Sequence, residues 1–247
     1  MPISPNQGPI SGGTTVTITG VNLASALSVS FGSQFATITA NTPTSVTVTS
    51  PSGNGAVDVV VKTNGGSSNP LKFYYIPSPS FDSMSIYSGP TAGGNTVNLF
   101  GRYLSTATSV NVGPNTATPT VISDNQLSVA IPAGAGAGTV YVSITTNGGI
   151  TSGLNYTYID APTIDTLTPT SGSAAGGTSV TITGTNLSTT TSITFDGVVA
   201  SFGIISSTTV VAITPPGTVG AVDVVLTTTG GSATAASGYT YTSQPGI

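Results

Sequence analysis

The chain has 247 residues with a net charge of −4, and only 4% of its residues are charged. Its three Lys and Arg residues are too few to neutralise the phosphates that a nucleic-acid-binding surface contacts, and they exclude a polybasic membrane anchor for the same reason. No apolar run of about eighteen residues occurs, so we expect no membrane insertion, and the absence of Cys excludes a disulfide framework.

After the glycine pair Gly12-Gly13, apolar and polar residues alternate, beginning with Val16 and Ile18 between threonines. Alternation of this kind predicts β-strands that bury one face, and Val, Ile and Thr are residues that strands prefer. Turn residues separate the runs about every ten residues, which is typical of a sandwich or barrel. The apolar positions of the later predicted strands are Leu27, Val29 and Phe31; Val46 and Val48; Val57, Val59 and Val61; and Leu71, Phe73 and Tyr75.

The chain contains three copies of this unit. Residues 8–23 have the sequence GPISGGTTVTITGVNL, residues 89–104 GPTAGGNTVNLFGRYL and residues 172–187 GSAAGGTSVTITGTNL, a period of about 82 residues. The copies predict an all-β fold of three tandem immunoglobulin-like β-sandwich domains at residues 1–77, 78–160 and 161–247, here called repeats one, two and three. Later markers with the same spacing are Pro51, Pro132 and Pro215; Gly65-Gly66, Gly148-Gly149 and Gly230-Gly231; and Tyr75, Tyr158 and Tyr241.

Several markers predict local structure. The glycine pair Gly12-Gly13 is expected to have positive φ, and Gly20, Gly101 and Gly184 indicate bulges or close backbone approach. The leucines that follow, Leu23, Leu104 and Leu187, are expected to close the core. The joints at 76–81 (IPSPSF) and 159–164 (IDAPTI) contain proline, and such linkers act as semi-rigid spacers, so we expect the repeats to form a rod.

At this point the residues resemble a known family. The spacing P-x-x-G-x-x-x-G-G-x-x-V-x-[IL]-x-G-x-x-L is similar to the start of the IPT/TIG domain, here of a bacterial or bacteriophage type. The resemblance covers essentially the whole chain and implies an immunoglobulin-like fold, but the family includes receptors, DNA-binding factors and surface proteins, so it implies no single function. Repeat two departs at the first position, where Ile86, the residue before Tyr87, replaces proline. The matching residues are Pro5, Gly8, Gly12, Gly13, Val16, Ile18, Gly20 and Leu23 in repeat one, and Pro169, Gly172, Gly176, Gly177, Val180, Ile182, Gly184 and Leu187 in repeat three.

The residue inventory argues against catalysis. The chain has no His, Cys or Glu, so a Ser-His-Asp triad is impossible, and it has no nucleotide-binding motif. Asp58 and Asp223 alternate with valines and are expected to face solvent rather than to form a glycosidase pair. Asp160 and Asp165 flank a joint and offer half of a calcium site at most. We therefore expect no catalytic residue, no metal and no cofactor.

Repeat two carries large side chains where its siblings carry small ones. Phe100 replaces threonine, Arg102 replaces Val or Thr, Tyr103 replaces asparagine, and Tyr141 replaces aspartate. Strand alternation directs Phe100 and Tyr141 outward, and Tyr and Arg are enriched at binding hot spots. The alternative is that these side chains pack on a neighbouring repeat or on Phe81. Val60 and Val225 also lie on a nominal outer face. The candidate binding or assembly residues are Tyr87, Phe100, Arg102, Tyr103, Tyr141, Val60 and Val225.

Three functions compete. The first is a non-enzymatic structural or adhesive protein, displayed outside the cell on a bacterial surface, filament or virion, that assembles with proteins, including further copies of itself, or attaches to a host receptor. The first twenty residues have no basic start and no apolar core, hence no secretory signal, which favours a virion. The alternative is a carbohydrate-binding accessory module of a secreted polysaccharide-active protein, which would bind glycan through a row of aromatics, but Trp is absent. The third, a glycan-cleaving enzyme, fails on the residue inventory.

Overall fold

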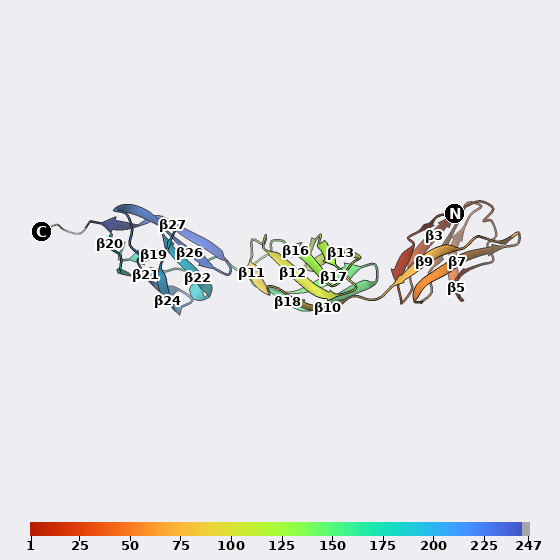
Figure 1. Ribbon diagram of the computed structural model, residues 1–247, viewed down its shortest axis with the longest axis horizontal. Helices are drawn as coiled ribbons and strands as arrows, with labels where there is room; N and C mark the ends of the chain where they lie inside the picture. Colours follow the sequence, from red (N-terminus) through yellow and green to blue (C-terminus); the bar gives the residue numbers. More distant parts are fainter. Residues whose placement is uncertain (244–247) are drawn as a thin grey trace. The chain divides into compact units, whose positions relative to one another are not determined.

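Alternating Thr and Val residues form the first long strand of repeat one, and its Val16 and Ile18 are fully buried. The computed structural model describes residues 1–243, and the strands of all three repeats are labelled in Figure 1. The strands of repeat one are β1 (Ile3–Ser4), β2 (Gln7–Pro9), β3 (Thr15–Thr19), β4 (Ser28–Phe31), β5 (Gln34–Asn41), β6 (Ser45–Thr49), β7 (Gly55–Thr63), β8 (Gly66–Ser67) and β9 (Leu71–Ile76).

Two layers of strands enclose the core of repeat one. The strands pair in the order β1-β3-β6-β5-β4-β7-β9-β2, and the long strand β5 joins the layers because it pairs with both β6 and β4. One layer contributes Val16, Ile18, Val46 and Val48 to the core; the other contributes Val29, Phe31, Val59, Val61, Phe73 and Tyr75.

Repeats two and three each form two separate sheets. In repeat two the sheets have the orders β10-β12-β16-β15 and β11-β18-β17-β13-β14, and in repeat three β19-β21-β25-β24 and β20-β27-β26-β22-β23. The strands of repeat two are β10 (Ser80–Met84), β11 (Ser88–Pro90), β12 (Thr96–Arg102), β13 (Ala107–Val112), β14 (Asn115–Ala117), β15 (Thr120–Ser123), β16 (Gln126–Ala130), β17 (Gly138–Thr146) and β18 (Gly149–Ile159). Those of repeat three are β19 (Thr166–Thr168), β20 (Ser171–Ser173), β21 (Ser179–Thr183), β22 (Thr190–Phe195), β23 (Val198–Val199), β24 (Ser201–Ser206), β25 (Thr209–Ile213), β26 (Gly220–Thr228) and β27 (Gly231–Thr242).

The first segment of every repeat changes sheets. Its first strand (β1, β10 or β19) pairs antiparallel in one sheet, and the next short strand (β2, β11 or β20) pairs parallel with the last strand of the repeat in the other sheet. The predicted all-β fold of three tandem immunoglobulin-like sandwiches is therefore confirmed. Within residues 1–243 the helical structure is one 3₁₀ turn, Leu187–Thr189, and no helix is long and apolar enough to cross a membrane.

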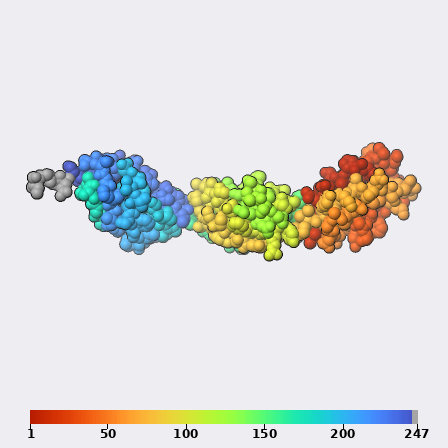
Figure 2. All heavy atoms as spheres, viewed as in Figure 1, coloured from red at the N-terminus to blue at the C-terminus, as the bar shows by residue number. Residues whose placement is uncertain are grey.

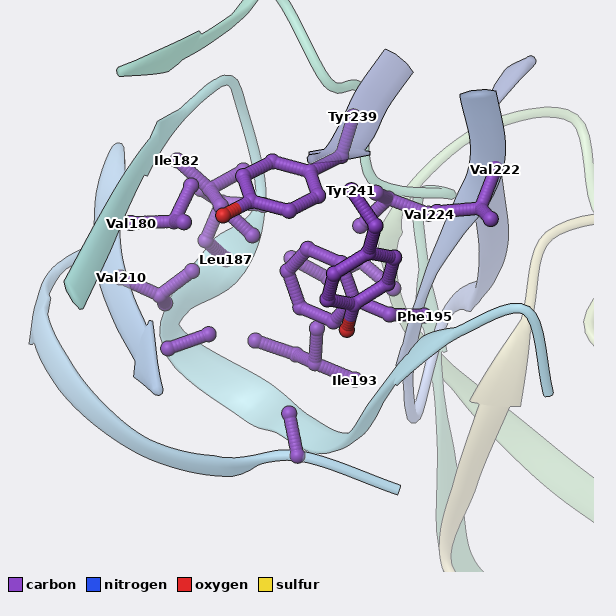
Figure 3. Close-up of a cluster of buried hydrophobic side chains, with 13 residues drawn as sticks. Val180, Ile182, Leu187, Ile193, Phe195, Val210, Val222, Val224, Tyr239 and Tyr241 are labelled. Atoms are coloured by element: carbon purple, nitrogen blue, oxygen red, sulfur yellow. The ribbon is translucent and has the colours of Figure 1, made fainter. Parts of the chain in front are cut away.

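The core of repeat three shows how the sandwich closes (Figure 3). Valines and isoleucines from both sheets meet the rings of Phe195, Tyr239 and Tyr241, which stack edge to face at 5.2 Å. Leu187 is fully buried, as are Leu104 and, to 3% exposure, Leu23, so the prediction that these leucines close the core is confirmed. In the space-filling view the atoms of each repeat pack closely (Figure 2).

The glycine predictions are confirmed except at Gly20. The pair Gly12-Gly13 has φ values of 75° and 89°, and both later pairs are also left-handed. At Gly101 and Gly184 a side chain would collide with the backbone carbonyls of Ser80 and Thr163, which is the predicted close approach. Gly20 differs, because the Met1 side chain covers it.

Strands pair only within a single repeat, but the compact units of the chain do not coincide with the repeats. Every sheet uses strands of a single repeat. By contrast, the chain has two compact units, residues 1–85 with 96–130 and 141–154, and residues 86–95 with 131–140 and 155–247, so their division passes through repeat two.

Candidate binding surface

Three of the predicted residues lie together at the end of strand β12. Phe100 and Arg102 are two positions apart and so share the outer face of their sheet, and Tyr103 follows directly. Phe100 is 36% exposed, Tyr103 is 45% exposed, and Arg102 is exposed as well. Phe81 pairs with Gly101, which alternation places on the opposite side from Phe100 and Arg102, so Phe81 does not cover them. We call Phe100, Arg102 and Tyr103 the β12 surface.

The backbone around Tyr103 holds its side chain outward. Tyr103 has a φ of 58°, the left-handed region that bulky residues avoid, whereas its counterparts Asn22 and Asn186 are of a type that tolerates it. The Asp124 carboxylate accepts hydrogen bonds from the Tyr103 and Ser105 amides at 3.3 Å each, and the Asp124 carbonyl accepts one from Leu104 at 2.9 Å. A single aspartate therefore fixes the loop that presents the surface.

The remaining aromatic candidates lie elsewhere in repeat two. Tyr141 is 75% exposed on β17, in the sheet opposite to that of β12, so it and Phe100 face away from each other on the sandwich. Tyr87 is 48% exposed between β10 and β11, and its carbonyl accepts a hydrogen bond from Thr157. The outward orientation predicted for Phe100 and Tyr141 is confirmed, but the two residues belong to different surfaces.

The two valine candidates are only half-buried, on strands β7 and β26. Val60 lies opposite Ser30 on one neighbouring strand, and Val225 lies opposite Thr194 and Thr234 on two, so these neighbours partly cover the valines. They belong to different repeats, and neither adjoins the β12 surface. Their role in binding or assembly stays a prediction.

Sequence reasoning missed a second group of exposed apolar residues. Ile122 is 56% exposed on β15, and Ile205 is 68% exposed on β24; both strands end their sheets. Phe35, on β5 of repeat one, is 71% exposed. A departure from alternation, as in the adjacent Ile204-Ile205, is the signal that could have identified these positions.

The aspartates have local structural roles. Asp58 is exposed and forms an ion pair with Lys72 at 2.8 Å. Asp223 is exposed and accepts a hydrogen bond from the Ser237 amide at 2.7 Å, and Asp165 accepts one from the Thr163 hydroxyl at 3.0 Å. The prediction that Asp58 and Asp223 face solvent is confirmed.

Comparison with known proteins gives a family match along nearly the whole chain. Residues 1–75, 79–158 and 162–243 each match the IPT/TIG domain. Plexin-A2 of Mus musculus is 36% identical over 118 residues, which are 46% of this chain and 6% of that protein. The chain thus spans a small fraction of the length of this relative.

Comparison with solved structures gives matches of low sequence identity. The full extracellular region of plexin A4 is 19% identical, with a TM-score of 0.48 over 89% of this chain and 21% of that one. FdeC, an Escherichia coli adhesin, is 16% identical, with a TM-score of 0.37 over 98% of this chain and 96% of that one.

Proposed function

The chain belongs to the IPT/TIG domain family, and from this premise we propose that it is a non-enzymatic surface protein whose tandem immunoglobulin-like domains bind other proteins. The family fixes the fold but not the function. The proposal therefore rests on the residue inventory and on the β12 surface.

The residue inventory favours binding over catalysis. Without His, Cys or Glu, the sequence lacks the histidine base that most often activates a serine nucleophile, and it lacks the cysteine thiol. The aspartates that remain are spread along the chain, and Asp58, Asp165 and Asp223 each contact a neighbouring cation, hydroxyl or amide. Such contacts suit local structural roles.

The β12 surface is the observation that carries the proposal. Repeats one and three have the same strand with small or polar residues at these three positions, so the sandwich does not require large side chains there. Tyr103 is held in a backbone conformation that costs about 1–3 kcal/mol for such a residue, and strain of this kind concentrates at functional sites. Aromatic and arginine side chains are also the usual anchors of protein interfaces.

The finer proposal concerns the partner and the location. We propose that the partner is either a further copy of this chain, in a homo-oligomer or filament, or a receptor on a host surface, and that the protein is displayed on a cell, filament or virion. A chain with only 4% charged residues has little electrostatic repulsion to keep its copies apart, which suits an assembled array. The domain limits at 77/78 and 160/161 are part of the same proposal.

A sibling swap tests the β12 surface. Phe100→Thr, Arg102→Thr and Tyr103→Asn together install the residues of repeat three, which the same strand accepts there. We expect the swap to weaken self-association or receptor binding at least about tenfold, because hot-spot truncations cost about 2 kcal/mol or more. Light scattering after gel filtration over a concentration series measures self-association, and binding to cells and glycan arrays measures receptor binding.

Tyr141→Asp provides the matched control. It installs the residue of the sibling repeats at an exposed aromatic position on the opposite sheet, so it should leave binding through the β12 surface unchanged. A swap variant that associates and binds like the parent would refute the assignment of the surface. Glycan binding that the swap abolishes would replace the proposal with the carbohydrate-binding accessory module.

A further inference from the structure

One sheet of repeat one has an outer face that is crossed by a partly apolar row of side chains. Phe35 on β5 lies opposite Ser30 on β4, and Ser30 lies opposite Val60 on β7. Directly opposite residues point to the same side of a sheet, so the three side chains form one row across three strands. Phe35 is 71% exposed and Val60 is half-buried, so the row is on the outside. We call this outer face the β7 face.

Both lysines of the chain lie on the β7 face. Alternation along β7 places Asp58 and Lys62 on the same side as Val60, and Lys72 lies opposite Asp58 on β9. The Lys72 ammonium pairs with the Asp58 carboxylate at 2.8 Å, whereas Lys62 is exposed and makes no ion pair within residues 1–243. The face therefore presents one uncompensated positive charge beside the apolar row.

Repeat two shows that the sandwich does not require these side chains. It has a small polar residue at each of the equivalent positions on the same strands. Where repeat one has Phe35, Val60, Lys62, Lys72 and Tyr74, repeat two has Thr116, Ser143, Thr145, Asn155 and Thr157. The large and cationic side chains of the β7 face are thus not needed for folding, which favours a role in contact with another molecule.

Repeat three has a similar row beside charges of the opposite sign. Val199, which is 68% exposed, lies opposite Thr194, and Thr194 lies opposite Val225 on β26. Alternation places Asp223 on the same side of β26 as Val225. Asp196 is its neighbour, because the Asp196 amide donates a hydrogen bond to the Asp223 carbonyl at 3.0 Å, and both aspartates are exposed. We call this outer face the β26 face.

The two repeats as a whole also differ in the sign of their charge. The side chains of repeat one include two Lys and one Asp, a net charge of +1, whereas those of repeat three include three Asp and no Lys or Arg, a net charge of −3. Opposite charges steer association, and like charges suppress it. Repeat one of one copy is therefore attracted to repeat three of another copy, while two copies of repeat three repel each other.

The charges also select the direction of the strands in such a contact. Sheets that pack face to face lie about 10 Å apart. If the two rows lie over each other with their strands antiparallel, Lys62, two residues after Val60, meets Asp223, two residues before Val225. If the strands are parallel, the neutral ion pair of the β7 face lies over Asp223, and Lys62 meets no carboxylate. The antiparallel arrangement is therefore the favourable one.

We propose that the β7 face of one copy binds the β26 face of a second copy of this chain. The contact is heterologous, because each copy offers one face of each kind, so association can continue into a ring or a filament. Four strands and four alternate residues cover roughly 20 Å in each direction, or about 400 Å² per partner, which is half of a standard interface. We therefore expect a weak contact, with a dissociation constant on the order of 100 μM.

This proposal rests on the self-assembly part of the proposed function, but it does not use the β12 surface. It also gives a common role to Val60 and Val225, which lie at the same place in their repeats. In repeat two the equivalent residue is Ser143, so that repeat offers neither face.

Exchanging the two charges tests the contact. Lys62→Asp and Asp223→Lys each bring like charges together, so each variant alone should self-associate at least about tenfold more weakly than the parent. The chain with both substitutions has opposite charges at the contact again, and it should self-associate like the parent. Sedimentation velocity over a concentration series up to about 1 mM, well above the expected constant, measures the change.

The matched control is the chain with Lys62→Asp and Asp82→Lys. It has the same net charge as the parent and as the exchanged chain, but the exposed Asp82 lies in repeat two and on neither face. Its self-association should stay weak. Asp223 also accepts a hydrogen bond from the Ser237 amide at 2.7 Å, so Asp223→Asn, which keeps an acceptor, checks that loss of charge and not loss of this bond weakens association.

Three outcomes overturn the proposal. The first is a parent chain that stays monomeric up to about 1 mM. The second is a chain with Lys62→Asp alone that associates like the parent. The third is equal recovery by the exchanged chain and by the control chain, which would make the effect one of net charge. If the swap on the β12 surface abolishes self-association while Lys62→Asp leaves it intact, the proposed function stands and this contact does not.

Discussion

At the scale of single residues, one hydrogen bond recurs in all three repeats. The hydroxyls of Tyr75, Tyr158 and Tyr241 donate to the carbonyls of Pro51, Pro132 and Pro215 at 2.8, 2.7 and 2.7 Å. Both partners were evident in the sequence as markers with equal spacing, but only the structure shows that they touch. Markers with a regular spacing reveal a repeated unit. A contact between residues some 25 positions apart depends on how the strands pair, which the spacing does not show.

Replacing Tyr158 with Phe should destabilise repeat two. The substitution leaves the buried ring in place and removes the donor to Pro132, which costs about 1 kcal/mol of unfolding free energy for a lost hydrogen bond. Chemical denaturation followed by circular dichroism measures the change. An unchanged unfolding transition would show that water replaces the phenol as the hydrogen-bond donor to Pro132 at no cost in stability.

Tyr239 supplies the opposite case in repeat three. Its hydroxyl is buried without a hydrogen-bond partner among residues 1–243, and Figure 3 shows it among apolar side chains. The equivalent positions hold Tyr156, which donates to Asn95 at 3.0 Å, and Phe73 in repeat one. Tyr239→Phe should therefore be neutral or slightly stabilising, and it serves as the control for Tyr158→Phe.

At the scale of elements, the sequence predicts strands well where burial is one-sided. β3 and β12 alternate buried and half-buried or exposed residues as expected, because a period of two places every second residue in the core. β15 and most of β24 are exposed along both faces, so their sequences lack that alternation and were not predicted. Alternation also predicts that a residue lies on the outer face of a sheet, but it does not identify the sheet. The exposure of Phe100 and Tyr141 could therefore be predicted, whereas their location on opposite sheets could not.

The edge strand β24 offers a test of association. Ile205 is 68% exposed on β24, which is the last strand of its sheet among residues 1–243, and sheet edges promote pairing between chains. Ile205→Lys should reduce concentration-dependent light scattering while leaving the thermal midpoint within about 4 °C, since surface substitutions usually change stability by no more than about 0.5 kcal/mol.

The control for that edge is Thr218→Lys, which adds the same charge on an exposed loop of repeat three. If both lysine variants reduce scattering equally, the effect is one of net charge. If neither does, the edge takes no part in association and the β12 surface remains the candidate.

At the scale of the whole molecule, stability should fall at alkaline pH. Burial raises the pKa of phenols in all three repeats above the ordinary value of about 10, with a smaller contribution from neighbouring charges in some: Tyr75, Tyr156, Tyr158 and Tyr241. The hydrogen bond to Asp58 likewise raises the pKa of Lys72.

A raised folded-state pKa means that the folded chain holds its proton more tightly than the unfolded chain does. The stabilisation is therefore complete below pH 10 and is lost as the pH rises through the folded-state pKa values. Thermal midpoints measured from pH 8 to 12 should stay level up to about pH 10 and then fall. Because the raised phenols occur in every repeat, the decline should appear in all unfolding transitions. Tyr241→Phe should flatten the decline for repeat three alone, and an undiminished slope in that transition would show that Tyr241 ionises equally easily in both states.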